Sequence, residues 1–175
     1  MLEDWILRKK EIEDSKDKLK GADLCNAKLM QAKLKGASLE NADLTAAYLI
    51  KADLSGANLS GADLTQAVLS EADLSGADFD GAELEDTFLN GANLKDAVNL
   101  TCDQLDLANY DKDTIFPHYI TINWSPDGLC ECRWCVHQQG HRGRFLSLLL
   151  PGHRSGLPDR THDRCAGTQT GYGSG

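Results

Sequence analysis

The chain has 175 residues, a formal net charge of −9 and only 6% aromatic residues. A chain of this length is expected to form one domain with appendages. The negative charge argues against a conventional nucleic-acid binder, which needs a basic surface to displace counterions from phosphates. No apolar run is long enough to span a bilayer, and the acidic start does not resemble a signal peptide. A cytoplasmic protein is therefore expected.

Residues 1–18 are expected to form an N-terminal capping helix. Within residues 2–17, apolar side chains fall on roughly one helical face and charged side chains fill the remainder, as in a surface helix. A frayed, charged leader is the alternative. The apolar positions are Leu2, Trp5, Ile6 and Ile12.

Residues 19–100 contain a repeat with a period of five. A leucine, or once a phenylalanine, recurs at every fifth position from Leu19 to Leu94, which makes 16 consecutive units. The residue two positions before each leucine is alanine from the second unit onward, except at Thr87. A helix requires a period of 3.6 and a strand a period of 2, so the pattern excludes both.

A chain with this period must turn a corner in every unit. Leucine is expected to fill the middle of each coil, alanine to leave room near the corner, and glycine to tolerate the unusual dihedral angles of the corner. Four five-residue sides close a twenty-residue square, and stacked coils pair at the strand spacing of about 4.8 Å. Sixteen units then make about four coils.

The unit Ala-(Asp/Asn)-Leu-x-x, as in residues 57–61 and 62–66, resembles the A(D/N)LXX motif of the pentapeptide-repeat family. The resemblance covers about half of the chain. It implies an all-β solenoid, a right-handed quadrilateral β-helix of about four coils with short helical caps. The open ends of such a stack must be capped to prevent end-to-end association.

A C-terminal cap is expected over residues 101–120. Thr101 precedes Gln104 at the capping-box spacing, and residues 102–109 read as a short amphipathic helix. Residues 111–117 then read as a turn and an extended piece that can cover the last coil. This run resembles the closing segment of many pentapeptide-repeat proteins.

Residues 121–175 are expected to form an irregular, poorly ordered tail. No period survives there, and the charge becomes slightly basic, with six arginines against four acidic residues. The six cysteines of the chain are not arranged as a disulfide framework, which favours a reducing compartment. A zinc site is the alternative for the tail, although the spacing does not match a paired CxxC site. Its candidate ligands are Cys130, Cys132, Cys135 and His137.

Outward positions that recur every fourth unit are expected to stack on one side of the coils. One such column is acidic throughout and is called here the acidic ladder: Asp23, Asp43, Asp63 and Glu83. The next side carries mostly apolar residues and is called the apolar stripe: Met30, Tyr48, Ile50, Val68 and Phe88.

Each surface has two interpretations. In one interpretation, the acidic ladder consists of residues that the family motif tolerates and that keep the solenoid soluble. In the other, its carboxylates imitate a phosphate backbone. Some pentapeptide-repeat proteins are DNA mimics that occupy the DNA-binding saddle of gyrase, and this chain resembles them in charge but is short. The apolar stripe is covered by the N-terminal helix or the tail, or it contacts a partner or a second copy.

The repeat contains no catalytic constellation. It has no histidine, because the first histidine of the chain is His118. The sequence has no nucleophile elbow, P-loop or dinucleotide fingerprint, and no cofactor is expected. The predicted function is a non-catalytic protein-interaction module or scaffold with an unidentified protein partner or a homodimer, without direct nucleic-acid or membrane binding. The alternative is a DNA-mimicking inhibitor or regulator of gyrase or another topoisomerase.

Overall fold

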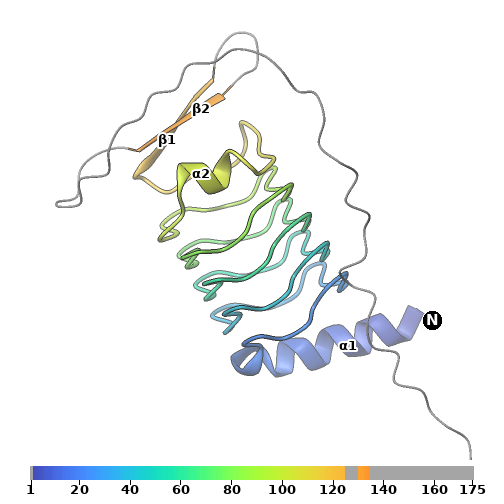
Figure 1. The fold of residues 1–175 in the computed structure, drawn as a ribbon. Helices are drawn as coiled ribbons and strands as arrows, with labels where there is room; N and C mark the ends of the chain where they lie inside the picture. The colour runs from blue at the N-terminus through green and yellow to red at the C-terminus, as the bar shows by residue number, and fades with distance from the viewer. Residues whose placement is uncertain (1, 125–129, 135–175) are drawn as a thin grey trace, which may run out of the picture. The chain divides into compact units, whose positions relative to one another are not determined.

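The computed structural model describes residues 2–124 and 130–134 (Figure 1). The chain divides into two compact units, residues 1–137 and 138–175, and the second lies outside the described residues. No helix among the described residues is long and apolar enough to cross a bilayer. The elements are α1 (Leu2–Asp14), the 3-10 helix η1 (Lys16–Lys18), α2 (Cys102–Leu105), β1 (Ile120–Trp124) and β2 (Cys130–Trp134).

Stacked coils connect η1 to α2 (Figure 1). Outward residues twenty positions apart form parallel bridges, as between Asp43 and Asp63, and the bridges fall into four columns. Each bridge is held by main-chain hydrogen bonds. The N–H of Asp43 donates to Ala22 O at 2.9 Å, and the N–H of Leu44 donates to Asp63 O at 2.8 Å. The expected twenty-residue coil with four sides is confirmed by this spacing.

The interior of the coils is filled by the leucine and alanine columns. From Leu24 to Leu94 every member of the leucine column is buried, including Phe79. Burying one leucine contributes about 1.5–3 kcal/mol before conformational entropy is counted. Thr87 replaces alanine and is also buried, and its hydroxyl donates to Leu64 O at 2.7 Å, so its polar atom is satisfied.

The corners use the left-handed backbone conformation. The residue before each member of the alanine column has a positive φ, for example 65° at Gly56 and 53° at Ala46. A side chain makes this conformation unfavourable by about 1–2 kcal/mol, which explains the many glycines at this position. The non-glycine corners show that the stack holds this conformation even where the residue disfavours it.

Helix α1 lies against the first coil. Ile12 is buried and Trp5 is half-buried, as expected for the face that covers the coil. The prediction for Ile6 was wrong, because its side chain is 51% exposed. The charged side chains of α1 contact the coil through specific hydrogen bonds, so the apolar pattern alone does not define the inner face.

Helix α2 is shorter than the expected helix over residues 102–109. The capping box is confirmed: the N–H of Gln104 donates to Thr101 Oγ1 at 3.2 Å, and the N–H of Thr101 donates to Gln104 Oε1 at 2.8 Å. The helix ends at Leu105 because the chain then pairs with the last coil. Leu107 O accepts from the N–H of Asp86 at 2.9 Å.

The segment after residue 120 differs from the irregular tail that the sequence predicts. Strands β1 and β2 form an antiparallel pair in which Ile122 faces Cys132. Residues 135–175 of the expected tail lie outside the described residues. Regular structure therefore extends beyond the C-terminal cap.

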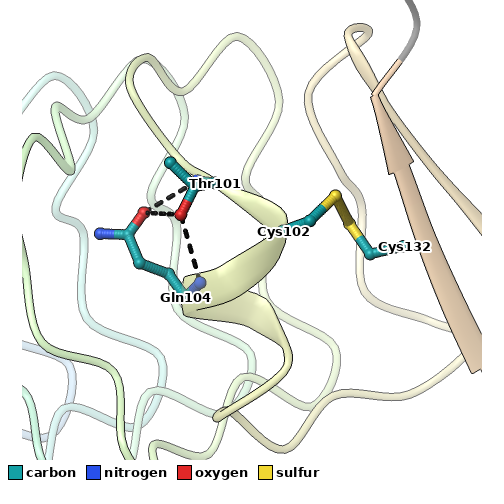
Figure 2. The surroundings of a disulfide bond; sticks show 4 residues. All are labelled: Thr101, Cys102, Gln104 and Cys132. Atoms are coloured by element: carbon teal, nitrogen blue, oxygen red, sulfur yellow. Dashed lines mark hydrogen bonds between the residues drawn. A yellow bond between two sulfur atoms is a disulfide. The ribbon is translucent and has the colours of Figure 1, made fainter. Parts of the chain in front are cut away.

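A disulfide joins Cys102 of α2 to Cys132 of β2, with their Cα atoms 5.5 Å apart (Figure 2). The expectation that the cysteines form no disulfides was wrong for this pair. Sequence spacing did not reveal the pair, because the two cysteines meet only when the hairpin folds back on the cap. Disulfides are typical of oxidising surroundings, so the argument for a reducing compartment loses its basis.

Candidate functional site

The outward residues of the four sides form four columns, and both predicted surfaces lie on them. The acidic ladder is one complete column, and three members of the apolar stripe lie in the next, which is called here the second column. In chain order the columns are Asp23, Asp43, Asp63 and Glu83; Lys28, Tyr48, Val68 and Phe88; Lys33, Asp53, Asp73 and Asn93; and Ser38, Asn58, Asp78 and Val98.

A local hydrogen bond explains why Asp and Asn recur at these positions. On the three columns other than the second, eight of the twelve residues are Asp or Asn, and Oδ1 of each accepts the backbone N–H two residues later. Such a bond stabilises the turn at the corner. The residues are Asp23, Asp43, Asp53, Asn58, Asp63, Asp73, Asp78 and Asn93.

The acidic ladder therefore has a structural role in its turns. Asp43 accepts the N–H of Thr45 at 2.9 Å, and Asp63 accepts the N–H of Thr65 at 3.0 Å. Asn makes the same bond at other positions, as at Asn58. This hydrogen bond thus requires a side-chain oxygen but not a negative charge.

Asp53 shows how this bond affects ionisation. The hydroxyl of Ser55 donates to its carboxylate at 2.7 Å, and the N–H of Ser55 donates at 3.0 Å. These bonds, with the charges of Lys35 and Lys16, outweigh partial burial and hold the pKa of Asp53 below its ordinary value. The charged form of Asp53 is therefore stabilised.

The second column departs from this rule in every coil. It carries Lys28, Tyr48, Val68 and Phe88, none of which is an Asp or Asn. Tyr48 is 45% exposed and Phe88 is 41% exposed, while Val68 is half-buried. The hydrogen bond that stabilises the turns on the other columns therefore does not account for the residues of the second column.

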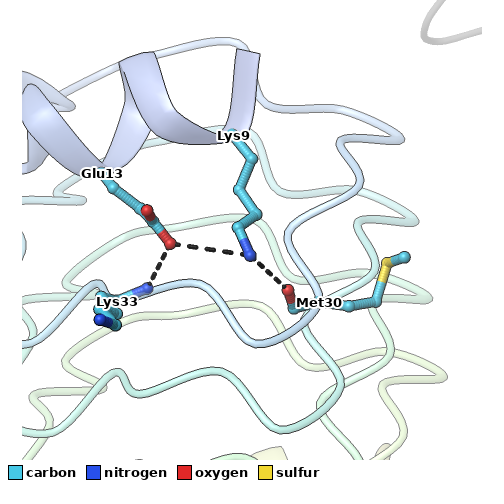
Figure 3. Close-up of polar contacts among 4 residues, drawn as sticks. All are labelled: Lys9, Glu13, Met30 and Lys33. Atoms are coloured by element: carbon cyan, nitrogen blue, oxygen red, sulfur yellow. Dashed lines mark hydrogen bonds and ion pairs between the residues drawn. The ribbon is translucent and has the colours of Figure 1, made fainter. Parts of the chain in front are cut away.

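The apolar stripe is not covered by α1 along its length. Lys9 Nζ donates to Met30 O at 3.0 Å and lies 3.9 Å from Glu13 Oε1, which places α1 at the first member of the stripe (Figure 3). Met30 and Ile50 are half-buried, whereas Tyr48 remains exposed. The alternative in which the N-terminal helix covers the apolar stripe is therefore wrong for Tyr48, whose side chain remains exposed.

The predicted zinc ligands are not brought together in the part of the chain that the structure describes. Cys132 forms the disulfide with Cys102 and cannot supply the thiolate that zinc requires. The side chain of Cys130, and all of Cys135 and His137, lie outside the described residues. Within those residues, no group of three or more His, Cys, Asp or Glu could hold a metal ion.

Sequence reasoning missed two polar groups that close the last coil. The hydroxyl of Tyr119 donates to Ala97 O at 3.0 Å and accepts from the N–H of Leu100 at 3.2 Å. Burial raises the pKa of Tyr119, so it remains a donor at neutral pH. Gln104 Nε2 also donates to Ala82 O at 2.8 Å. The capping-box spacing revealed Gln104, but not this second role.

The family model of pentapeptide repeats matches the chain in eight copies, over residues 18–45, 27–66 and 57–96. A pentapeptide repeat protein from the Arabidopsis thaliana thylakoid lumen is 31% identical, covering 62% of this chain and 69% of that chain, with a TM-score of 0.36. One from Nostoc PCC 7120 is 34% identical, covering 65% and 85%, with a TM-score of 0.37. QnrB1, a plasmid-mediated fluoroquinolone resistance protein, is 19% identical, covering 54% and 60%, with a TM-score of 0.33. No curated protein matches the sequence.

Proposed function

The chain belongs to the pentapeptide-repeat proteins, and from that premise we propose that it is a non-catalytic interaction module whose apolar stripe binds a protein partner. One observation carries the proposal. The second column lacks the Asp or Asn that the corners use on the other three sides, and it lacks them in all four coils. The right-handed quadrilateral path of the coils is part of the same proposal, supported by the four bridge columns with their twenty-residue spacing.

The exposed side chains of this column favour protein binding. Aromatic residues are enriched in the buried centres of protein interfaces, and contiguous apolar surface usually marks a contact site. Tyr48 and Phe88 lie two coils apart in one column, with Val68 between them. The spacing of about 4.8 Å per coil places the two rings about 10 Å apart, within one small interface.

The experiment replaces three stripe residues by the residue that the turns prefer. In the variant Tyr48→Asn, Val68→Asn and Phe88→Asn, each Asn can accept the N–H two residues later, so the fold should keep its stability. A benzophenone amino acid at position 88 should cross-link a partner in cells, and the same probe at position 78 on another column serves as the control. The proposal fails if position 78 captures the same protein equally well, or if the triple Asn variant still binds that protein.

The partner and a second copy of the chain are distinguished by sedimentation. If the purified parent sediments as a dimer and the triple Asn variant as a monomer, the occupant of the stripe is a second copy. If both are monomers, the cross-linked partner is a different protein. A dimer that persists unchanged in the variant places self-association elsewhere.

A second candidate function is regulation of gyrase or another topoisomerase by DNA mimicry. The observation that favours it is charge: residues 39–100 contain twelve acidic residues and two lysines. The acidic ladder repeats carboxylates at about 4.8 Å along the stack. This candidate is tested by gyrase supercoiling with and without the protein. The variant Asp63→Asn and Glu83→Gln removes two charges while Asn keeps the turn bond.

Dose-dependent inhibition that this charge variant loses would support mimicry. The matched control is Asp103→Asn, an exposed acid of α2 outside the ladder, which should inhibit like the parent. No inhibition at a large excess of folded protein would eliminate this candidate and leave the stripe as the functional surface.

A further inference from the structure

The first coil has an incompletely paired edge on two of its sides. In the second coil, the N–H groups of Asp43 and Tyr48 each donate to the preceding coil at 2.9 Å. The equivalent groups of the first coil are the N–H groups of Asp23 and Lys28. Neither of these donates to any residue that the structure describes. These two N–H groups and the strand positions that carry them are called here the open edge.

The other two sides of the same coil are paired. The N–H of Lys33 donates to Glu13 Oε1 at 2.8 Å (Figure 3). The N–H of Ser38 donates to Lys16 O at 2.9 Å. The α1–η1 segment therefore closes half of the coil end. On the open edge, the α1–η1 segment accepts neither the N–H of Asp23 nor the N–H of Lys28.

A pocket of about 360 Å³ lies beside the open edge, between α1 and the second side of the first coil. Trp5 supplies an aromatic wall and Ile12 an apolar one, and Lys28 belongs both to the lining and to the open edge. A strand edge that offers donors next to a side-chain pocket is the arrangement by which proteins bind extended peptides.

The charge of this end favours an acidic ligand. Residues 1–38 contain nine basic and seven acidic residues, whereas the next three coils are strongly acidic. The pocket is lined by Arg8, Lys9 and Lys28 against the single carboxylate of Asp4. Lys9 is engaged by Glu13 and Met30, but Arg8 and Lys28 form no ion pair with the described residues.

We propose that the open edge binds an extended acidic peptide segment of a partner protein, which adds one more layer to the first coil. Carbonyl groups of the peptide accept from the N–H groups of Asp23 and Lys28, and a carboxylate side chain enters the pocket beside Arg8 and Lys28. Because the two donors are one five-residue side apart, the peptide spans two sides of the coil, or about ten residues. The proposal does not depend on the function of the apolar stripe.

The probe is a labelled ten-residue peptide of alternating valine and glutamate, and an alternating valine and lysine peptide is its control. Amide hydrogen exchange of the full chain is measured by NMR. The acidic peptide should slow exchange at Asp23 and Lys28 by about tenfold or more, because hydrogen-bonded amides exchange only on opening. The amide of Lys33, already bonded to Glu13, is the internal control and should not change.

Charge reversal tests the pocket. The variant Arg8→Glu and Lys28→Glu should weaken the acidic peptide by about tenfold or more, since each pair of like charges opposes binding. Lys33→Glu, an exposed lysine at the equivalent position of the next side, is the matched control and should bind like the parent. Circular dichroism confirms that each variant is folded.

Three outcomes would overturn the proposal. The first is equal binding of the valine and lysine peptide, and the second is no change of exchange at Asp23 and Lys28 under saturating acidic peptide. The third is slow exchange of both amides in the free full chain, which would show that residues of the same chain already cover the open edge.

Discussion

The two ends of the coil stack are closed by different chemistry. At the C-terminal end the main chain continues the ladder beyond the last repeat. The N–H of Leu89 donates to Asn109 O and the N–H of Leu94 donates to Ile115 O, both at 2.7 Å. Gln104 and Tyr119 add neutral side-chain bonds to the remaining sides.

At the N-terminal end, a helix and mainly charged side chains close the coil. The carboxylate of Glu13 accepts a main-chain N–H of the first coil. The side chains of Lys9 and Lys16 donate to main-chain carbonyl groups of the same coil, and Lys16 bonds Lys35 O at 2.6 Å. The difference follows from helix geometry. The main-chain groups within α1 bond one another, so only the side chains of this helix can bond the edge of the coil. The irregular segment after α2 has unpaired main-chain groups that can bond the last coil.

The comparison predicts that the C-terminal closure contributes more stability. Replacing both Cys102 and Cys132 by serine should have the largest effect, because the disulfide joins residues 30 positions apart. We expect the free energy of unfolding to fall by about 3 kcal/mol. Urea denaturation of parent and variant measures the difference, after peptide mapping has verified the 102–132 linkage. A loss below about 1 kcal/mol would contradict the predicted role of the disulfide.

Gln104→Ala should have the next largest effect. It removes the partner of the Thr101 N–H and leaves Ala82 O without its side-chain donor, so we expect a loss of about 2 kcal/mol. Asp103→Ala, an exposed residue of the same helix, is the control and should cost less than about 0.5 kcal/mol. Equal losses in the two variants would show that the contacts of Gln104 are unimportant.

Glu13→Ala should destabilise the N-terminal end by about 1 kcal/mol, because it removes one acceptor of the first coil. Glu11→Ala, an exposed acid on the same helix, should be nearly neutral. Thermal unfolding at low and high salt distinguishes the ends. Salt should reduce the effect of Glu13→Ala and leave that of Gln104→Ala unchanged, since only the former removes a charge. Salt dependence of both would remove the contrast between the ends.

Asp111 is a charged group within the C-terminal closure. Its replacement is expected to have the smallest effect on stability. Partial burial raises the pKa of Asp111, but hydrogen bonds from the Gly91 N–H at 2.9 Å and the Thr114 hydroxyl at 3.0 Å outweigh it and hold the pKa below its ordinary value. The stabilisation is complete above the ordinary value of about 3.9 and is lost as the pH falls through the lower value of the folded state.

Asp111→Asn should therefore lose less stability than the parent when the pH falls from about 5 to about 2. Asp113→Asn, an exposed acid two residues later, is the control. The measurement is the free energy of unfolding at several pH values. Identical acid dependence of Asp111→Asn and the parent would show that the carboxylate does not respond to its partners.

The repeat could be predicted from the sequence because each unit repeats the same local solution. Leu44, Leu64 and Leu84 occupy equivalent positions, so one argument applies to all of them. The period of five and the four sides of a coil were enough to place the acidic ladder and the apolar stripe in columns. The bridges confirm that placement, while the binding roles of both surfaces remain predictions.

The ends could not be predicted in the same way, because each contact there occurs once. The Cys102–Cys132 disulfide and the Tyr119 hydroxyl depend on how the chain returns to the last coil. The turn bond of Asp and Asn was available from the sequence as a preference. Its importance emerged only when the structure showed that the second column never uses it.

Duplication of a five-residue unit and duplication of a twenty-residue coil would have different effects on the surface of the protein. Duplication of one unit would preserve every leucine and alanine in the interior, so the hydrophobic core would not resist it. It would nevertheless rotate all downstream sides by a quarter turn, and Phe88 would leave the column of Tyr48. Only duplication of a complete coil lengthens the stack and keeps its surfaces aligned. Evolution of this protein's length should therefore proceed by whole coils wherever a surface is under selection.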